Sequence, residues 1–382
     1  MATHNAADVV VVGGGLIGTA IAWQLQTAGV SVTLVSGEAA AAASGVAAGM
    51  LAPVTETAFT EERLLALNLA SMARYGDFVD SLEQATDRSA GLRRTPTLSV
   101  AYNADDAARL SALSGYLDRL GLTSTRLTSR ECRSHEPLLS PAIRSGLLVE
   151  GDWSCDNRLL WAALTEAARR AGVRSVPGFV HAVESTRDRV TGVVLADGTG
   201  LPTGTVVLAN GAWAAQVTGV PAIPVRPVKG QILRLDPGRL PGPSLTVRAI
   251  SQGTEVYLVP RASGREVVVG ATVEDLGFDG RVTAGAVYEL LRDARSVLPM
   301  TAEYALTETS VGWRPATPDN APLLGPAGLD GLLLATGHYR NGVLLTPVTA
   351  AAITGLVLDG ELLPVARDFT LDRFSTRLEP VP

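Results

Sequence analysis

The sequence has few of the residues that build disulfide frameworks or metal sites. It contains two cysteines, Cys132 and Cys155, among 382 residues. Two cysteines are too few to stabilise a chain of this length, and they lack the spacing of metal ligands. The four histidines form neither an HxH nor an HExxH pattern. We therefore expect a fold held by its apolar core, without a metal site.

Long apolar runs and an excess of basic charge are also missing. No stretch approaches the roughly twenty apolar residues of a membrane-spanning helix. The first apolar run, Val9 to Val12, follows a polar start without the basic residues of a signal peptide. The net charge of −6 argues against a basic face for nucleic acid. These absences predict a cytoplasmic protein with neither a membrane nor a nucleic acid as partner.

The first forty residues predict a βαβ unit. The run Asp8–Val12 is β-branched, Leu16–Ala28 has helical spacing, and Val30–Val35 is a second buried strand. Between them, residues 13–18 read GGGLIG and satisfy the GxGxxG pattern in its strand–turn–helix context. Such glycines permit a tight turn and the close approach of a diphosphate to the N–H groups at the helix start. The pattern predicts a dinucleotide site but does not choose between FAD and NAD.

The remaining pattern predicts an α/β protein (α+β overall) with a Rossmann-like domain and an inserted antiparallel-sheet substrate domain. Helices are expected at residues 61–84, 105–120, 157–171, 283–298 and 341–358, with the N-cap of the third at Asp156 or Asn157. A β-rich middle separates strand-to-helix segments at the two ends. We assign residues 1–85, 151–222 and 320–365 to the dinucleotide domain, and residues 86–150 and 223–319 to the substrate domain.

The end of the second strand departs from the usual dinucleotide pattern. An acidic residue is expected there to hold the adenosine ribose, but the strand ends in Ser36, with Glu38 two residues later. Either Ser36 supplies a weaker hydroxyl contact, or Glu38 reaches back, or Glu38 is an ordinary surface residue.

The following segment, residues 43–53, reads ASGVAAGMLAP. It is too broken by glycine for a stable helix and too small for an ordinary core strand. Small residues allow a backbone to run close beside a flat ring system. The segment resembles the flavin loop of the D-amino acid oxidase superfamily and, within it, of the glycine oxidases that serve thiamine biosynthesis.

Further segments carry this resemblance in order, from about Asp8 to Asp359. They are residues 206–213 (VVLANGAW), 227–231 (PVKGQ), 256–261 (VYLVPR), 268–272 (VVGAT), 312–319 (GWRPATPD) and 337–345 (GHYRNGVLL). The last two are the most specific. Several ordered motifs are stronger evidence than any one of them.

The resemblance implies that the dinucleotide domain is an FAD-binding domain. Some relatives attach FAD through a cysteine in the C-terminal half, whereas both cysteines here precede residue 156, so we expect non-covalent FAD. Val180 is expected beside the adenine, and the helix opened by residues 337–344 beside the flavin pyrimidine. The implied cofactor-binding residues are Gly13, Gly15, Ile17, Gly18, Ser36, Gly37, Ser44, Gly45, Gly49, Met50, Leu51, Val180, Gly211, His338, Tyr339, Asn341, Gly342, Val343 and Leu344.

The resemblance also implies a substrate site. An arginine fork binds a carboxylate with two hydrogen bonds, and Arg314 in the GWRP segment is the first candidate for that role. Arg340 is a second candidate, and Tyr257 is expected to hydrogen-bond the carboxylate and to line the pocket. His338 is not needed as a base.

The implied reaction is the oxidation of a small amino acid, glycine first of all. Hydride passes from the α-carbon to the flavin, oxygen reoxidises the flavin to give hydrogen peroxide, and the imine hydrolyses to glyoxylate and ammonia or feeds thiazole synthesis. A D-amino acid or sarcosine oxidase, a flavin amine dehydrogenase with another acceptor, and a binding module without catalysis are the alternatives. The family often forms homo-oligomers, among them tetramers.

Overall fold

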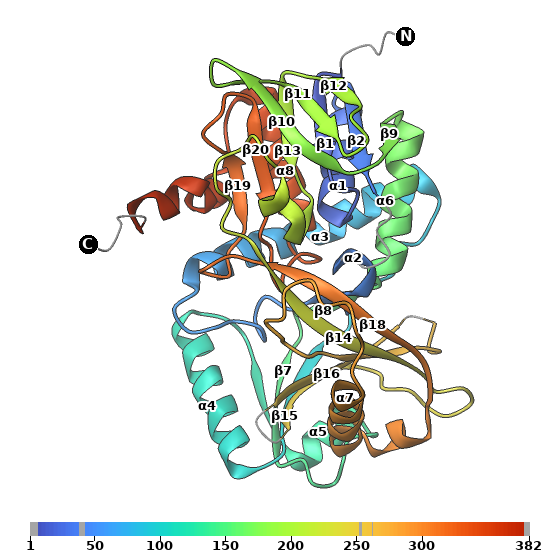
Figure 1. The fold of residues 1–382 in the computed structure, drawn as a ribbon. Helices are drawn as coiled ribbons and strands as arrows, with labels where there is room; N and C mark the ends of the chain where they lie inside the picture. The colour runs from blue at the N-terminus through green and yellow to red at the C-terminus, as the bar shows by residue number, and fades with distance from the viewer. Residues whose placement is uncertain (1–6, 38–42, 252–253, 262, 378–382) are drawn as a thin grey trace.

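The computed structural model describes residues 7–37, 43–251, 254–261 and 263–377. Figure 1 shows two large sheets, one in each half of the molecule, with most helices in the half that holds the N-terminus. One sheet has six strands and the other has eight. The predicted mixed α/β fold is confirmed.

The six-stranded sheet has the order β19-β20-β13-β1-β2-β9. Its strands are parallel, except that β19 runs antiparallel to β20. The bounds are β1 Val9–Val12, β2 Val32–Ser36, β9 Arg174–Pro177, β13 Thr205–Leu208, β19 Leu323–Pro326 and β20 Leu332–Thr336.

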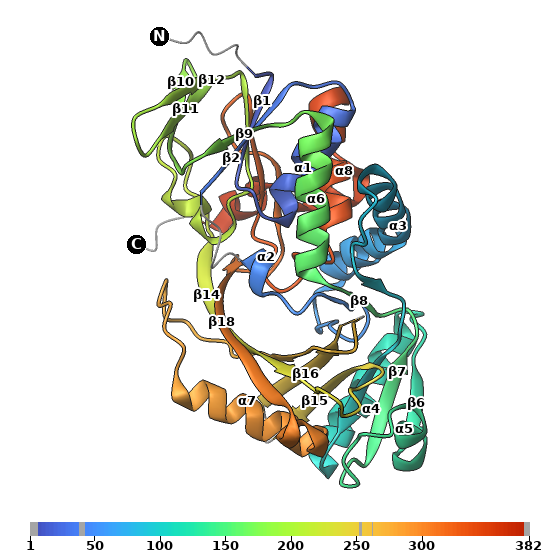
Figure 2. The same ribbon diagram turned by 90° about the vertical axis from the view of Figure 1, so that its right-hand side faces the viewer.

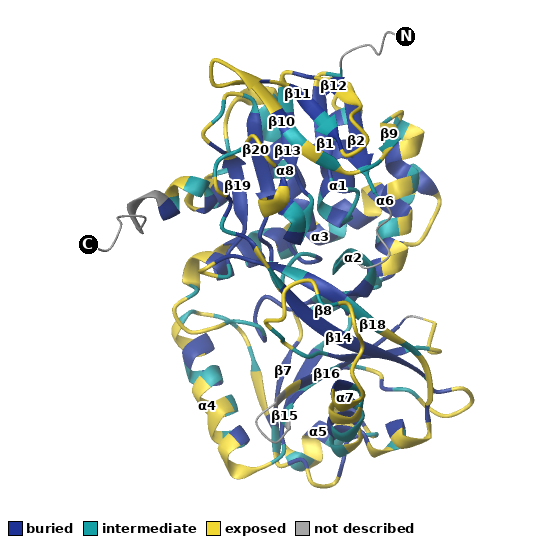
Figure 3. Cartoon of the chain, in the orientation of Figure 1, coloured by how far each residue is buried: buried dark blue, intermediate teal, exposed yellow. Residues whose placement is uncertain are grey.

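Both faces of this sheet are covered, which explains why β1 is apolar at every position. Val9 and Val11 pack in the core that contains the helices, whereas Val10 and Val12 pack in the core on the opposite face. The helices are α1 Leu16–Thr27, α3 Glu62–Thr86, α6 Asn157–Ala171 and α8 Thr346–Asp359. A three-stranded antiparallel sheet, β10 Val180–Thr186, β11 Arg189–Leu195 and β12 Gly200–Pro202, covers the other face. Figure 3 shows the resulting burial of the central strands.

The eight-stranded sheet has the order β18-β14-β17-β16-β15-β5-β7-β6. It is antiparallel apart from the parallel pair β5 and β15. The bounds are β5 Thr97–Ala101, β6 Thr125–Thr128, β7 Ser145–Val149, β14 Arg226–Asp236, β15 Thr246–Ser251, β16 Thr254–Pro260, β17 Val267–Gly270 and β18 Ala305–Ala316. One face packs against α7 Ala284–Val297 through Leu290 and Ala294, and Figure 2 shows α7 on the side away from the other domain.

Shorter elements connect the two sheets and close the chain. A small sheet joins β3 Met50–Leu51, β8 Trp153–Cys155 and β4 Leu92–Arg93. The other elements are α2 Ala43–Val46, α4 Ala104–Arg119, α5 Ser129–His135 and the 3-10 helices η1 Gly211–Gln216, η2 Pro299–Glu303, η3 Pro364–Phe369 and η4 Leu371–Arg377.

The strands divide along the chain in a way that supports the proposed domain bounds. The strands of the six-stranded sheet lie within residues 9–36, 174–177, 205–208 and 323–336, and those of the eight-stranded sheet lie within residues 97–149 and 226–316. The small sheet β3-β8-β4 lies where the proposed bounds meet. The division itself stays a proposal.

Local details confirm some predicted elements and correct others. Helix α6 spans Asn157–Ala171 as predicted, and Asp156 is its N-cap because its carboxylate accepts from the N–H groups of Arg158 and Leu159. The last predicted helix was placed too early, since α8 begins at Thr346 rather than near residue 341. Residues 339–345 form turns instead, with Pro347 in the first helical turn. The segment thought too glycine-rich for a helix contains the four-residue α2.

No single helix among the described residues is long and apolar enough to span a membrane. One sharply bent pair, Thr346–Asp359 with Pro364–Phe374, passes on length and composition alone.

Candidate active site

A cavity of about 570 Å³ lies between the two large sheets. The wall on the side of the six-stranded sheet is formed by β1, the start of α1 and the loops after β2, β13 and β20. The wall on the side of the eight-stranded sheet is formed by β14, β16 and β18. The carboxyl ends of parallel strands and a domain interface are both common places for a cofactor. Its lining includes Gly13, Gly14, Gly15, Ser36, Ser44, Gly49, Glu56, Phe179, Asn210, Trp213, Gly230, Tyr257, Trp313, Arg314, His338 and Arg340.

The glycine turn after β1 is shaped by contacts within the fold. Gly13 has φ +110°, and a Cβ there would lie 2.6 Å from the carbonyl oxygen of Ala209. A Cβ on Gly18 would lie 1.9 Å from the oxygen of Gly13. Gly18 therefore permits the close packing of α1 on the turn, and, although the resemblance implies a cofactor contact, it does not itself line the cavity.

The start of α1 keeps hydrogen-bond donors for a ligand. Its N-cap, Gly15, has no side chain, and the N–H group of Ile17 has no acceptor among the described residues. Only Leu16 is capped there, by the Ser44 hydroxyl at 3.0 Å. Free N–H groups at a helix start attract phosphate oxygens, so this end of the cavity fits a diphosphate.

The end of β2 and the loop after it border the cavity. The Ser36 hydroxyl donates to the carbonyl of Gly37 at 3.1 Å, and Ser36 lines the cavity. Glu38 lies outside the described residues. Phe179, which is 63% exposed, rests on Gly37, where a Cβ would meet its ring at 2.2 Å. Val180 begins β10 and also lines the cavity.

The small-residue loop is fixed by its packing on β8. Gly49 has φ +80°, and a Cβ there would lie 1.8 Å from the carbonyl oxygen of Cys155. The glycine at this position is thus required by the neighbouring strand, whatever ring lies beside the loop. Leu51 is fully buried in the helical core and does not line the cavity.

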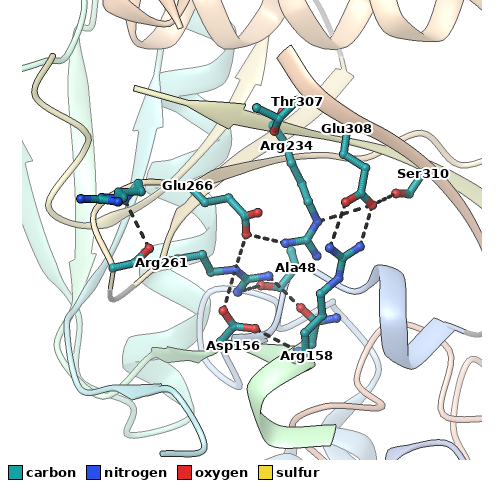
Figure 4. Close-up of polar contacts among 12 residues, drawn as sticks. Ala48, Asp156, Arg158, Arg234, Arg261, Glu266, Thr307, Glu308 and Ser310 are labelled. Carbon is teal, nitrogen blue, oxygen red and sulfur yellow. Dashed lines mark hydrogen bonds and ion pairs between the residues drawn. The ribbon is translucent and has the colours of Figure 1, made fainter. Parts of the chain in front are cut away.

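Arginines from both domains hold the same loop, as Figure 4 shows. Arg261 is 3% exposed and donates to the carbonyl of Ala48 at 2.8 Å. Arg158 donates to the carbonyl of Gly45 at 3.1 Å and binds the carboxylate of Glu308 with contacts of 2.9 and 2.6 Å. Because Glu308 is on β18 and Arg158 on α6, this pair joins the eight-stranded sheet to a helix of the other half of the molecule, beside that loop.

Buried Arg234 completes that cluster. Its guanidinium, 1% exposed, contacts Glu266 at 2.5 Å and Glu308 at 3.8 Å. Glu266 also lies 3.4 Å from Arg261, and Asp156 lies 3.7 Å from Arg261. Buried charges need such partners because burial removes their hydration.

The loop after β20 forms the wall beside the proposed flavin end. His338 is buried, contacts the Thr349 hydroxyl at 2.9 Å, and has a pKa lowered to about 3 by burial. It is therefore neutral at ordinary pH. The N–H groups of Gly342 and Val343 have no acceptor among the described residues, and both residues line the cavity. These donors would suit an acceptor-rich ring edge, although the helix itself begins later.

Helix α3 fixes that loop from behind. The Ser71 hydroxyl donates to the carbonyl of Leu344 at 2.6 Å, and the Tyr75 hydroxyl donates to that of Val343 at 3.2 Å. Both side chains are fully buried. These two hydroxyls occupy the carbonyl groups of the loop. The N–H groups of Gly342 and Val343 are not used in these bonds and stay available on the cavity side.

Arg314 is a cation without an ion pair among the described residues. One guanidinium nitrogen, Nη1, donates to the carbonyl of Thr272 at 3.0 Å and lies 3.5 Å from that of Lys229. The guanidinium rests on Gly230, where a Cβ would lie 2.4 Å from Nη1. Two carbonyls and a glycine hold one side of the fork, which leaves its other donors for a carboxylate in the cavity.

Tyr257 stands beside Arg314. Its ring rests on Gly270, where a Cβ would lie 2.3 Å from the hydroxyl oxygen. Burial raises the pKa of Tyr257, and the neighbouring charge of Arg314 opposes that rise. The hydroxyl therefore stays protonated and can donate.

Arg340 is placed differently from Arg314. Its Nη2 lies 3.4 Å from a carboxylate oxygen of Glu56 and 3.1 Å from one of Glu255. The charge of Glu56, with that of Glu255, raises the pKa of Arg340. Arg340 lines the cavity, but its charge is already paired.

The cavity brings together most of the predicted site residues. Those that do not line it are Gly18, Gly45, Leu51, Asn341 and Leu344. Several residues that were not predicted from the sequence also line it, among them Glu56, Phe179, Asn210, Trp213, Gly230 and Trp313. Asn210 and Trp213 lie within the VVLANGAW motif, but a sequence pattern does not show which of its side chains face a cavity.

Similar proteins point to the same chemistry. A family model described as FAD dependent oxidoreductase matches residues 8–356. A bifunctional protein ThiO/ThiG from Synechocystis sp. is 37% identical over 99% of this chain and 55% of its own length. The chain thus spans about half the length of that relative. Glycine oxidase from Geobacillus kaustophilus is 32% identical over 96% of this chain and 97% of its own.

Solved structures agree with the sequence comparison. The crystal structure of the Geobacillus kaustophilus glycine oxidase matches with a TM-score of 0.89 and 31% identity, over 96% of this chain and 99% of that one. Iminodiacetate oxidase from Chelativorans sp. BNC1 matches with a TM-score of 0.85 and 28% identity, over 95% and 98%. The resemblance predicted from the motifs is confirmed, and the chain belongs to the family of FAD dependent oxidoreductases, with FAD as its cofactor.

Proposed function

We propose that this chain catalyses the FAD-dependent oxidation of glycine to its imine and glyoxylate, with oxygen as the acceptor and hydrogen peroxide as product. The observation that carries the proposal is Arg314, an arginine without an ion pair among the described residues, in the wall of the cofactor cavity. A carboxylate is the natural partner of such a fork. The similarity to glycine oxidases supports the choice of substrate.

The residues of the cavity fit FAD. The free N–H groups at the α1 start would hold the diphosphate, with Gly13 and Gly15 permitting its approach. Ser36, Gly37 and Val180 would contact the adenosine. The loops 43–50 and 338–343 would border the flavin. When bound, FAD supplies a two-electron oxidant for the α-carbon of the substrate.

The described cysteines support non-covalent binding. Cys132 is buried in the core of the substrate sheet, and Cys155 is buried beneath the loop at Gly49. Neither lines the cavity.

The protein's own contribution is to bind and orient the amino acid. Arg314 would hold the carboxylate and Tyr257 would donate a further hydrogen bond to it. A fixed carboxylate places the α-carbon, and orientation of this kind accounts for much of the acceleration in such reactions. His338 is neutral and contacts Thr349, so we assign it no role as a base.

An anaerobic absorbance titration with glycine tests the proposal. Bleaching of the flavin band, reversed by air, is expected. A band that responds to D-alanine or sarcosine but not to glycine would overturn the substrate and keep the reaction class. Bleaching that air does not reverse would point to a dehydrogenase.

Three broader properties belong to the proposal. A role in thiazole formation for thiamine biosynthesis is supported by the bifunctional ThiO/ThiG relatives, which match this chain over about half of their length. The cytoplasmic location and the homo-oligomer stay predictions.

A further inference from the structure

The cavity contains two guanidiniums in opposite electrostatic states. Arg314 contacts backbone carbonyls and no carboxylate among the described residues. Arg340 contacts two carboxylates, those of Glu56 and Glu255. Arg314 is therefore available to bind an anion, whereas Arg340 already has carboxylate partners from the chain itself.

Glu56 is the partner on the cavity side of Arg340. Its side chain is 8% exposed and it lines the cavity, whereas Glu255 is 59% exposed and does not. Tyr257 lies close enough to Arg314, Glu56 and Arg340 for all three charges to affect its pKa. The Glu56–Arg340 pair thus faces the same pocket as the open Arg314.

A second arginine contacts the same two carboxylates. Arg248 lies 3.5 Å from Glu56 and 3.7 Å from Glu255. Without the charge of Glu56, Arg340 would keep only the exposed Glu255 as a carboxylate partner, and its guanidinium would have a free side at the substrate pocket.

Glu56 is held firmly in place. Its turn is anchored by Asp152, whose carboxylate accepts from the N–H groups of Val54 at 3.0 Å and Thr55 at 2.6 Å. The N–H group of Glu56 also donates to the carbonyl of Ala52 at 3.1 Å. The backbone at Glu56 is thus fixed, and its carboxylate is held by Arg248 and Arg340. A second carboxylate on the substrate would meet a like charge there.

We propose that Glu56 determines substrate specificity: by pairing with Arg340 it cancels a charge that would otherwise bind the second carboxylate of a dicarboxylic amine, and so it restricts the site to amino acids with one carboxylate. This inference rests on the proposed function, because it takes Arg314 as the site of the first carboxylate. The excluded substrates are dicarboxylic amines. Iminodiacetate, which appears in the name of one structural relative, is an example.

Two unreactive ligands test the inference without turnover. Methoxyacetate and diglycolate share an ether in place of the amine and differ by one carboxylate. Their dissociation constants are measured from the change in the visible spectrum of the FAD-bound protein. The wild-type protein should bind diglycolate no more tightly than methoxyacetate. Glu56→Gln should strengthen diglycolate binding by about tenfold, the effect of one added charged hydrogen bond, and leave methoxyacetate within about twofold.

Further variants separate the pair from a general change in the pocket. Adding Arg340→Met to Glu56→Gln should remove the gain for diglycolate. Glu255→Gln, on the exposed side of Arg340, should give a smaller gain, and it tests the same pairing if Glu56→Gln does not fold. An unchanged ratio of the two constants in Glu56→Gln, or a gain that persists without Arg340, would overturn the inference.

Turnover distinguishes this inference from the proposed function. The ratio of kcat/KM for iminodiacetate to that for glycine should rise in Glu56→Gln. A wild-type protein that oxidises no amino acid would remove the proposed function, while the two dissociation constants would still decide the role of Glu56.

Discussion

The guanidinium of Arg314 occupies the space that a side chain on Gly230 would need. The two residues are diagonal neighbours on the β14–β18 ladder, in which Gly230 pairs with Gly312 and Val228 with Arg314. A Cβ on Gly230 would lie 2.4 Å from Nη1 of Arg314. The position of the proposed carboxylate clamp therefore depends on a glycine on the neighbouring strand.

Replacement of Gly230 by alanine should displace the clamp. We expect Gly230→Ala to lower kcat/KM for glycine by about tenfold or more, the loss of one charged hydrogen bond, without releasing FAD. Steady-state kinetics and the flavin spectrum would measure both effects. Gly285→Ala is the control, because no atom lies within 4 Å of a Cβ there. Equal activity of both variants would show that the contact is unimportant.

Arg314 itself should be needed for its fork as well as its charge. Arg314→Ala should lower kcat/KM for glycine by roughly 100-fold, and Arg314→Lys should recover only part of the loss because lysine cannot bind a carboxylate through two parallel hydrogen bonds. Arg63→Ala, at an arginine that is 79% exposed, provides the control. Full activity in Arg314→Lys would show that a positive charge is enough to bind the carboxylate and that two parallel hydrogen bonds are not needed.

Two glycines of the flavin loop should respond differently to alanine. At Gly49 the backbone has φ +80° and a Cβ would lie 1.8 Å from the Cys155 oxygen, whereas at Gly45 the nearest atom lies 3.8 Å away. Gly49→Ala should lose several degrees of Tm and retain less FAD, by strain and overpacking. Gly45→Ala should behave like the wild type. Thermal unfolding and the flavin content of the purified proteins would decide.

The Arg158–Glu308 pair should make stability depend on pH in the acidic range. The Arg158 hydrogen bonds lower the pKa of Glu308 to about 2, below the roughly 4.3 of an unfolded chain. The unfolded state then binds the proton more readily, so the contribution of the pair is complete above about pH 5 and is lost as pH falls toward 2. The Tm difference between wild type and Glu308→Gln should shrink from pH 6 to pH 3. Exposed Glu303→Gln should show no such trend, and a constant difference for Glu308→Gln would contradict the pairing.

FAD should leave the protein when it is denatured. Cys132 and Cys155 are both buried, and burial raises their pKa to about 11 and about 12, so neither is a thiolate. Precipitation with acid should leave a colourless pellet and free FAD in the supernatant. A yellow pellet after washing would demonstrate a covalent bond and would require a different attachment residue.

The motifs predicted where the chain's chemistry lies better than they predicted its exact structure. The glycine turn, the bounds of α6 and the GWRP segment that contains Arg314 follow from local patterns. The start of α8 was placed too early because apolar spacing continues through residues 341–345, where the chain forms turns instead. The Gly49 requirement could not be inferred, since the clashing oxygen belongs to Cys155, more than a hundred residues away.

The sequence by itself determined the dinucleotide turn, the family and the arginines able to bind a carboxylate, because these depend on residues that are close together in the chain. Only the tertiary structure decided which arginine is open. Arg314 and Arg340 both lie in characteristic motifs, but Glu56 and Glu255 neutralise one of them from distant segments. Electrostatic pairing acts through space, so only the folded chain decides that Arg340 is paired while Arg314 remains without a carboxylate partner in the cavity.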